Sequence, residues 1–207
     1  MIKLENVDVY GWEAAIRGAR NPMNSWDKMD TIFHSEYAPA IGENDEKLLR
    51  SLANAGPDHG KFLRMITVSL DITAPLYWWK EFDTYKVGTV ANSCSTMHKI
   101  HAKEFTLDDF SHDHLDGVSK DRVLTPAINW LNEFREEYLR TRAKFFWWQL
   151  IQLLPSSYNQ RRTVLLNYQV LKSMYHARKN HKLDEWRIFC DFIKNLPHSE
   201  LITGGDE

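Results

Sequence analysis

The stretch ITAPLYWWKEFDTYKVGTVANSCSTMHK, residues 72–99, decides how the chain is interpreted. It continues the segment FLRMITVSLDIT, whose β-branched residues and alternation predict a strand. Pro75 then lies in the first turn of an expected helix, APLYWWKEFDTY, because the fixed φ of proline suits a helix N-terminus. Core packing accounts for the adjacent Trp78 and Trp79, but it leaves their charged neighbours and the polar run NSCST unexplained.

Length and composition indicate a folded protein of one domain, residues 1–207. The chain is 43% hydrophobic and 26% charged with a formal net charge of −2, so its bulk charge does not indicate a nucleic-acid partner. The sequence has no apolar run of about eighteen residues, and its first residues lack the pattern of a signal peptide. We therefore expect a cytoplasmic protein with no membrane partner.

The aromatic content is high, at 13% with eight tryptophans. Aromatic side chains supply large apolar area and flat stacking faces, so this content is compatible with a dense core, an oligomer interface or a pocket for a flat ligand. The two cysteines, Cys94 and Cys190, are expected to be free thiols because no export signal accompanies them.

The other elements are assigned from periodicity and from capping residues. IKLENVDVY predicts a strand and GWEAAIRGARNP a helix, while NDEKLLRSLANAG predicts a helix capped by Asn44 or Asp45 and closed by Gly56. Residues 87–120 have weak periodicity and are expected to be irregular. Later helices are predicted at 124–154, 159–180 and 184–195, followed by a frayed end, ITGGDE.

On the second of these late helices, an amide and a guanidinium flank two apolar residues at helical spacing. Asn167, Leu171, Met174 and Arg178 are separated by four, three and four residues, which places them on one stripe. Such a stripe can pack a flat ring and end on an anion, because a guanidinium binds phosphate through two hydrogen bonds. The alternative is an ordinary amphipathic edge on which Arg178 is solvated.

The segment LLPSSYNQRRT is expected to break one helix and start another. Ser156, Ser157 or Asn159 can cap the new N-terminus, where free amides and the helix dipole favour an anion. Arg161 and Arg162 add positive charge, so a phosphate site is possible there. The alternative is a cap without a ligand.

Histidines and a cysteine in the polar region raise the possibility of a zinc site, from Cys94, His98, His101, His112 and His114. These residues match no strict ligand pattern, and histidines in polar loops are mostly solvated. We therefore expect no metal. Cys94 alone remains open to three interpretations, as a nucleophile, as a substrate contact or as an inert small residue.

The order of these segments resembles the flavin-dependent thymidylate synthases, the ThyX family, from about Leu48 to Leu196. The shared features are a strand, an AP helix start, an aromatic helix, a polar segment, an LP break at Leu154-Pro155 and a late helix of the pattern N…R…H…W. GPDHGKF keeps the histidine of the family's first motif as His59. The family's late asparagine and its nucleotide-contacting arginine correspond to Asn167 and Arg178.

Most of the family's signature is replaced. The replacements are Glu81 at the family's glutamine, Thr84, Tyr85 and Lys86 at its Arg-His-Arg, Cys94 at its second serine, and Thr96, Ile151 and Gln169 at arginines. Each lost arginine removes charge-assisted contacts that are worth about 1.5 to 3 kcal/mol when desolvated. The resemblance therefore concerns the scaffold more than the active site.

The resemblance implies an α/β (α+β) fold with a mostly antiparallel central sheet, long helices and a helix-rich C-terminal half. In the family, FAD lies at the interfaces of a homotetramer, dUMP stacks on the flavin, and a one-carbon unit from methylenetetrahydrofolate is transferred and reduced with hydride from NADPH. No protein nucleophile is required, so the catalytic residues are left unassigned. The implied substrate contacts are Lys86, Cys94, Glu81 and Arg178, and the implied cofactor contacts are His59, Tyr85, Asn167 and Gln169.

Three hypotheses remain open. The first is a divergent enzyme that binds FAD and modifies C5 of a pyrimidine deoxynucleotide of the dUMP type, although Glu81 also leaves a cytosine nucleotide open. The second is a protein with the same fold that has lost flavin chemistry and binds a nucleotide or serves in assembly. The third is an unrelated helical metal protein that uses the histidines.

Overall fold

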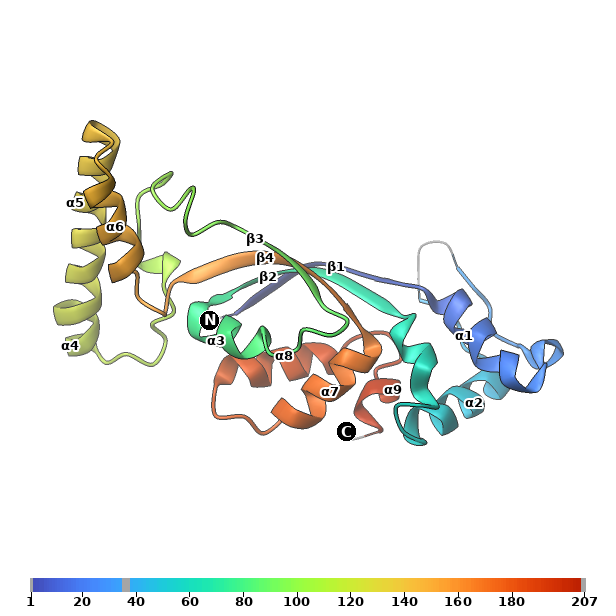
Figure 1. Cartoon of the computed structure of the whole chain (residues 1–207). Helices are drawn as coiled ribbons and strands as arrows, with labels where there is room; N and C mark the ends of the chain where they lie inside the picture. Colours follow the sequence, from blue (N-terminus) through green and yellow to red (C-terminus); the bar gives the residue numbers. More distant parts are fainter. Residues whose placement is uncertain (1, 35–37, 206–207) are drawn as a thin grey trace. The chain divides into compact units, whose positions relative to one another are not determined.

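A computed structural model describes residues 2–34 and 38–205. Four antiparallel strands form its sheet, in the order β1 (Lys3–Tyr10), β2 (Thr67–Pro75), β4 (Asn159–Asn167) and β3 (Val90–Ser93). Helices accompany the sheet, which confirms the predicted α/β (α+β) class (Figure 1). The contacts divide the chain into two compact units, which are described separately below, and the expectation of a single domain stays a prediction.

The strand β2 follows the alternation seen in the sequence. Val68, Leu70, Ile72 and Ala74 are buried, and the residues between them are partly exposed. A burial period of two is what a strand with one face on the core requires. A 3₁₀ turn, Gly60–Arg64, precedes the strand, which begins at Thr67.

The first unit comprises residues Met1–Lys3, Ile72–Asp83 and Asn92–Arg162. Its helix α3 (Leu76–Phe82) begins directly after Pro75, as the sequence predicts. Trp78 and Trp79 are almost fully buried, and their ring centroids lie 4.9 Å apart in an edge-to-face arrangement. The paired tryptophans are therefore core residues, and aromatic pairs of this kind add about 0.5–1.5 kcal/mol to the burial of their area.

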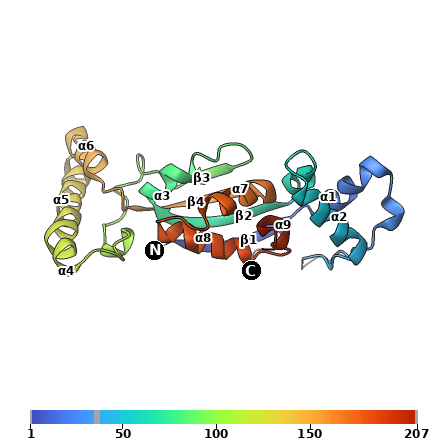
Figure 2. The same cartoon turned by 90° about the horizontal axis from the view of Figure 1, so that it is seen from below.

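The single helix predicted over 124–154 is in fact two helices, α5 (Thr125–Thr141) and α6 (Lys144–Leu153), which lie side by side in Figures 1 and 2. Arg142 separates them in the left-handed conformation, with φ 58°. The Thr141 hydroxyl bonds both the Glu137 carbonyl at 2.7 Å and the Ala143 N–H at 3.2 Å, which closes the last turn of α5. A short turn, α4 (Gly117–Ser119), continues through one π-helical turn into α5.

The hydrophobic core beneath α5 and α6 is built from both helices and from the irregular segment before them. Its buried side chains are Ile100, Phe105, Phe110, Leu124, Ile128, Leu131 and Leu150. The polar segment that the sequence left irregular is thus anchored by three apolar residues. It also contains the short strand β3, which the sequence analysis missed because all four of its residues are exposed and carry no hydrophobic pattern.

The second unit comprises Leu4–Asp71, Thr84–Ala91 and Thr163–Glu207. Its helices are α1 (Trp12–Arg20), α2 (Glu43–Asn54), α7 (Tyr168–Arg178), α8 (Asp184–Lys194) and α9 (Glu200–Thr203). The predictions of α1 and α8 are confirmed. The predicted N-cap of α2 is wrong, because the helix starts after Gly42 and the Asp30 carboxylate accepts the N–H groups of Asn44 and Asp45 at 2.9 and 3.0 Å. Gly56 does follow the end of the helix, with φ 99° directly after the C-cap Ala55.

The helix predicted over 159–180 is wrong in its first half, since Asn159–Asn167 form β4. Val164 and Leu166 are buried while Thr163 and Leu165 are exposed, which is the period of a strand. The helix begins only at Tyr168, where Asn167 caps it by accepting the Val170 N–H at 3.0 Å.

The expectation of a frayed end is also wrong where it can be checked. Leu201, Ile202 and Thr203 are buried in α9, and Asp206 and Glu207 lie outside the described residues. Apolar side chains in this last turn tie the end of the chain to the second unit. No helix in the described part of the chain is both long enough and apolar enough to span a membrane.

Candidate functional site

In the second unit, Arg178 at the end of α7 is held against two aromatic side chains. Its guanidinium carbon lies 4.9 Å from the centroid of the Trp186 ring on α8 and 5.7 Å from that of Tyr85. Its Nε donates a hydrogen bond to the Tyr85 hydroxyl at 3.1 Å. Cation–π contacts and this hydrogen bond hold the guanidinium in one place, which is the pre-organisation that anion recognition requires.

The segment that carries Tyr85 and Lys86 runs beside α7, from Arg178 toward the N-terminus of that helix. Gly88 has φ +79°, and a Cβ built on it would lie 2.8 Å from the Asn167 side-chain nitrogen. Only glycine permits this close approach to the helix cap. The structure thus brings Tyr85, Lys86 and Asn167 to α7, and Lys86 is exposed there.

Gln169 and His59 lie at the same end of α7. A Cβ built on Gly60 would lie 3.5 Å from the Gln169 side-chain oxygen, so the 3₁₀ turn that follows His59 packs beside Gln169. His59 itself is exposed. Two predicted cofactor contacts, Asn167 and Gln169, therefore lie at the N-terminus of α7, and the predicted substrate contact Arg178 lies at its C-terminus.

The middle of the predicted stripe on α7 is not available to a ligand in this arrangement, since Leu171 and Met174 are fully buried. The two other predicted substrate contacts belong to the first unit. Glu81 is partly exposed on α3, and Cys94 is exposed directly after β3. The Cys94 backbone is bound on both sides, its N–H to the Arg161 carbonyl at 2.9 Å and its carbonyl to the Gln160 amide at 2.7 Å.

The helix start expected near Ser156 is wrong, because β4 and not a helix begins there. Both alternatives, a phosphate site and a cap at a helix N-terminus, depended on that helix. The Arg162 guanidinium carbon lies 4.1 Å from the Trp79 ring centroid, and its Nη1 pairs with the Asp83 carboxylate at 2.7 Å. The backbone carbonyls of Ser156 and Ser157 accept hydrogen bonds from Tyr77 and Ser111. These contacts join the segment to other parts of the first unit.

The histidines do not form a metal site in the described part of the chain, where no group of three or more His, Cys, Asp or Glu side chains is suitably gathered. The ring nitrogens of two of them have other contacts. His98 Nδ1 lies 3.0 Å from the Ser95 hydroxyl, and His112 Nδ1 lies 2.9 Å from the Phe110 carbonyl oxygen.

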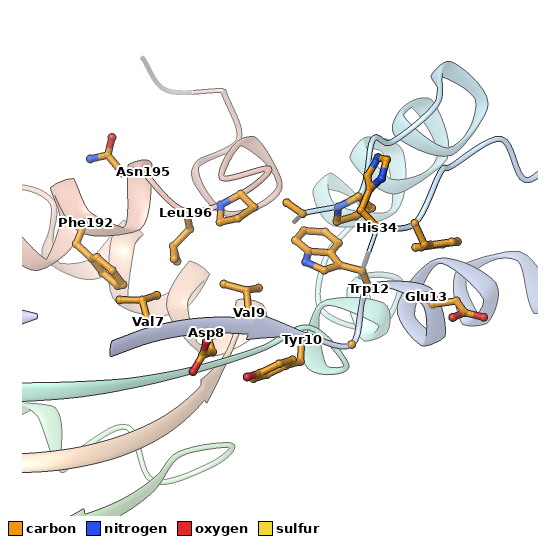
Figure 3. A pocket seen from close by; sticks show the side chains of 15 residues that line it. Val7, Asp8, Val9, Tyr10, Trp12, Glu13, His34, Phe192, Asn195 and Leu196 are labelled. Carbon is orange, nitrogen blue, oxygen red and sulfur yellow. The ribbon is translucent and has the colours of Figure 1, made fainter. Parts of the chain in front are cut away.

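A cleft of about 730 Å³ in the second unit contains none of the predicted site residues. Figure 3 shows its walls, formed by the end of β1, the start of α1 and the end of α8. Val7, Val9 and Leu196 make it apolar on one side, while Asp8 and His34 add polar groups. Trp12 is buried beside it, and its indole N–H has no acceptor among the described residues.

Comparison of the sequence with protein-family models and with curated proteins gives no match. Among solved structures, the chain is similar to flavin-dependent thymidylate synthase ThyX from Helicobacter pylori complexed with FAD and dUMP, with a TM-score of 0.70 and 15% identity over 98% of each chain. The chain has the ThyX fold. A second ThyX structure from that organism, with FAD and dUMP, has a TM-score of 0.70 and 14% identity over 99% of this chain and 98% of that one.

The chain is also similar to a third solved structure. A UMP/dUMP methylase, PolB from Streptomyces cacaoi bound with 5-Br dUMP, has a TM-score of 0.65 and 16% identity, covering 99% of this chain and 95% of that one. The predicted scaffold is therefore confirmed.

Two contributors to the site were missed by sequence reasoning. Trp186 lies in an amphipathic helix whose apolar residues are typical of a protein core. Its contact with Arg178 joins two helices, so the pattern of either helix alone does not indicate it. Gly88 carried a usable signal, since an isolated glycine indicates a turn or a close backbone approach.

Proposed function

We propose that the protein binds a pyrimidine deoxynucleotide of the dUMP type together with FAD and modifies C5 of the base. The observation that carries the proposal is the ThyX fold over 98% of the chain, combined with a guanidinium held at the end of α7. Methylenetetrahydrofolate and NADPH are the corresponding donors of carbon and hydride, and the cytoplasm is the corresponding location.

The side chains of the candidate site fit such ligands by their chemistry. Arg178 and Lys86 supply positive charge for a phosphate, while Gln169 and Asn167 offer amides and Tyr85 an aromatic face. His59 belongs to the same group, and Glu81 and Cys94 are the contacts proposed from the first unit. Bound FAD supplies the redox chemistry, and the protein's own part is to bind, orient and exclude water.

Assembly into a homo-oligomer, with a tetramer as the proposed state, belongs to this proposal. Its support is the exposed apolar surface of the first unit. Trp130 is 57% exposed, Phe145 63% and Leu153 54%, and large exposed aromatics are typical of interfaces.

A second candidate function is a nucleotide-binding or assembly protein without flavin chemistry. The residues Thr84, Thr96, Ile151 and Gln169, which stand where the family has arginines, favour it. Loss of two charge-assisted contacts lowers affinity by about a hundredfold or more.

The visible absorbance spectrum separates the two candidates. We would record it on the freshly purified protein and again after addition of FAD and removal of the excess. A retained flavin band supports the enzyme, and dUMP and dCMP are then titrated. Absence of retained flavin, with dUMP still bound in calorimetry, supports the second candidate. Absence of both contradicts the proposal.

A further inference from the structure

We propose that the end of α5 and the turn before Ala102 form a binding site for a phosphate-bearing anion. The site consists of Lys99, His101, Arg135 and Arg142, all in the first unit. It is independent of the proposed function, because none of these residues belongs to the substrate or cofactor contacts described above.

Side-chain and backbone contacts hold His101, Arg135 and Arg142 together. The His101 ring packs edge-to-face on Tyr138 of α5, with centroids 4.8 Å apart. The Arg142 guanidinium carbon lies 5.7 Å from the same Tyr138 ring, and Arg135 Nε donates to the His101 carbonyl at 3.1 Å. The end of α5 thus holds Arg135 against the backbone of His101 and Arg142 on the same Tyr138 ring that His101 contacts.

The cations of this cluster lack carboxylate partners. Within the described residues, Lys99, Arg135 and Arg142 make no ion pair, whereas the neighbouring Arg140 pairs with Glu137 and Lys103 pairs with Asp109. Like charges gathered without a counter-charge repel one another, and a polyvalent anion removes that repulsion. The contrast with Arg140 shows that the neighbouring surface has carboxylates that can pair with cations.

His101 gives independent support. Its Nδ1 is buried and has no hydrogen-bond partner among the described residues. Burial lowers the pKa of the imidazole, and Arg142, Lys99 and Arg135 lower it further. These three charges are all positive, which is the environment that an anion would balance.

The conformation of Arg142 points in the same direction. It occupies the left-handed region with φ 58°, at a helix end where glycine is preferred. Cations near a helix C-terminus also stabilise the helix dipole, which accounts for Arg140 and Arg142. The dipole does not account for Arg135, which lies well inside α5, or for Lys99 on another segment.

The ligand chemistry is a phosphate or diphosphate group with at least two negative charges, because planar guanidinium groups bind phosphate oxygens in pairs. Such a group is found in free pyrophosphate, in a nucleoside diphosphate and in the backbone of a single-stranded oligonucleotide. The experiment below separates these sources.

Binding of pyrophosphate to the full chain at low salt would be measured by calorimetry, and competition by a nucleoside diphosphate and by a single-stranded oligonucleotide would follow. The variant Arg142→Gly removes the charge while giving the left-handed position its preferred residue, so the thermal midpoint should stay unchanged or rise. We expect this variant to bind pyrophosphate at least tenfold more weakly. Arg135→Gln should have a similar effect.

The matched control is Arg140→Gln. It removes a positive charge two residues before Arg142, from a side chain that is paired with Glu137. It should change the affinity less than twofold. Competition by only one of the two larger ligands identifies the source of the phosphate and supports the site. The proposal is overturned if pyrophosphate does not bind the natural chain, or if Arg142→Gly and Arg140→Gln weaken binding equally. Flavin and dUMP binding by Arg142→Gly reports separately on the proposed function.

Discussion

Arg178 at the end of α7 rests on the face of Trp186 in α8, with 4.9 Å between the guanidinium carbon and the ring centroid. The two residues are separated by a turn and by part of a second helix, so their contact depends on how α7 and α8 pack. A guanidinium on an indole keeps its charge while losing freedom of movement, which lowers the entropic cost of binding an anion.

The first prediction concerns this contact. Arg178→Gln should weaken binding of dUMP at least tenfold, because it removes a charge-assisted partner of the nucleotide. Calorimetric titration of dUMP measures the loss. Arg187→Gln on α8 is the matched control, since Arg187 pairs with Asp184 on the exposed side of that helix. Equal affinity of the Arg178 variant and the natural chain would remove Arg178 from the site.

The buried ion pair between Arg20 and Asp45 supports the second prediction. Nε and Oδ1 are 2.6 Å apart, and both side chains are almost fully buried. Asp45 also accepts hydrogen bonds from the Thr31 N–H at 2.9 Å and hydroxyl at 2.6 Å. Asp45→Asn should lower the free energy of unfolding by about 3–5 kcal/mol, because it leaves a buried guanidinium uncompensated.

Urea unfolding of Asp45→Asn measures this loss. The exposed pair of Glu46 and Arg50 provides the comparison, and Glu46→Gln should cost less than about 1 kcal/mol. Similar losses in the two variants would mean that burial does not determine the contribution of the Arg20 pair.

Substitutions at Gly88 and at other glycines should separate the cost of backbone strain from the cost of a close contact. Gly88 and Gly56 both have positive φ, +79° and +99°, but only at Gly88 would a Cβ meet other atoms. Gly56→Ala should cost about 1 kcal/mol from backbone strain, and Gly88→Ala should cost clearly more. Gly117→Ala, with ordinary φ and open space, should be nearly neutral. Chemical denaturation of the three variants gives the ranking, and equal costs at Gly56 and Gly88 would contradict the close approach to Asn167.

The fourth prediction concerns pH. Burial and the charges of Arg142, Lys99 and Arg135 lower the pKa of His101 below its ordinary value of 6.5. The unfolded chain therefore binds more protons than the folded one below that value, so the contribution of His101 to stability falls as the pH decreases from about 6.5. In NMR titration the His101 imidazole should have a midpoint below its ordinary pKa of 6.5, and Arg142→Gly should raise this midpoint. A midpoint at or above 6.5 in the natural chain would contradict the geometry of the cluster.

The amino-acid sequence determined the elements whose signals are local. The alternation in β2, the proline before α3, the apolar stripe of α8 and the order of segments that resembles ThyX are all present in short stretches of residues. Burial of one face and the stereochemistry of proline act over a few residues, so these elements and the scaffold could be predicted.

Only the tertiary structure decided the rest. The residues 159–167 carry apolar positions compatible with a helix or a strand, and pairing within the sheet selected β4. Arg162 has a side chain that can bind phosphate, but it forms an ion pair with Asp83, which is distant in sequence. Arg178 keeps its place because Tyr85 and Trp186 pack beside it. Such outcomes depend on long-range contacts, whose free energies exceed local propensities and leave no periodic trace in the sequence.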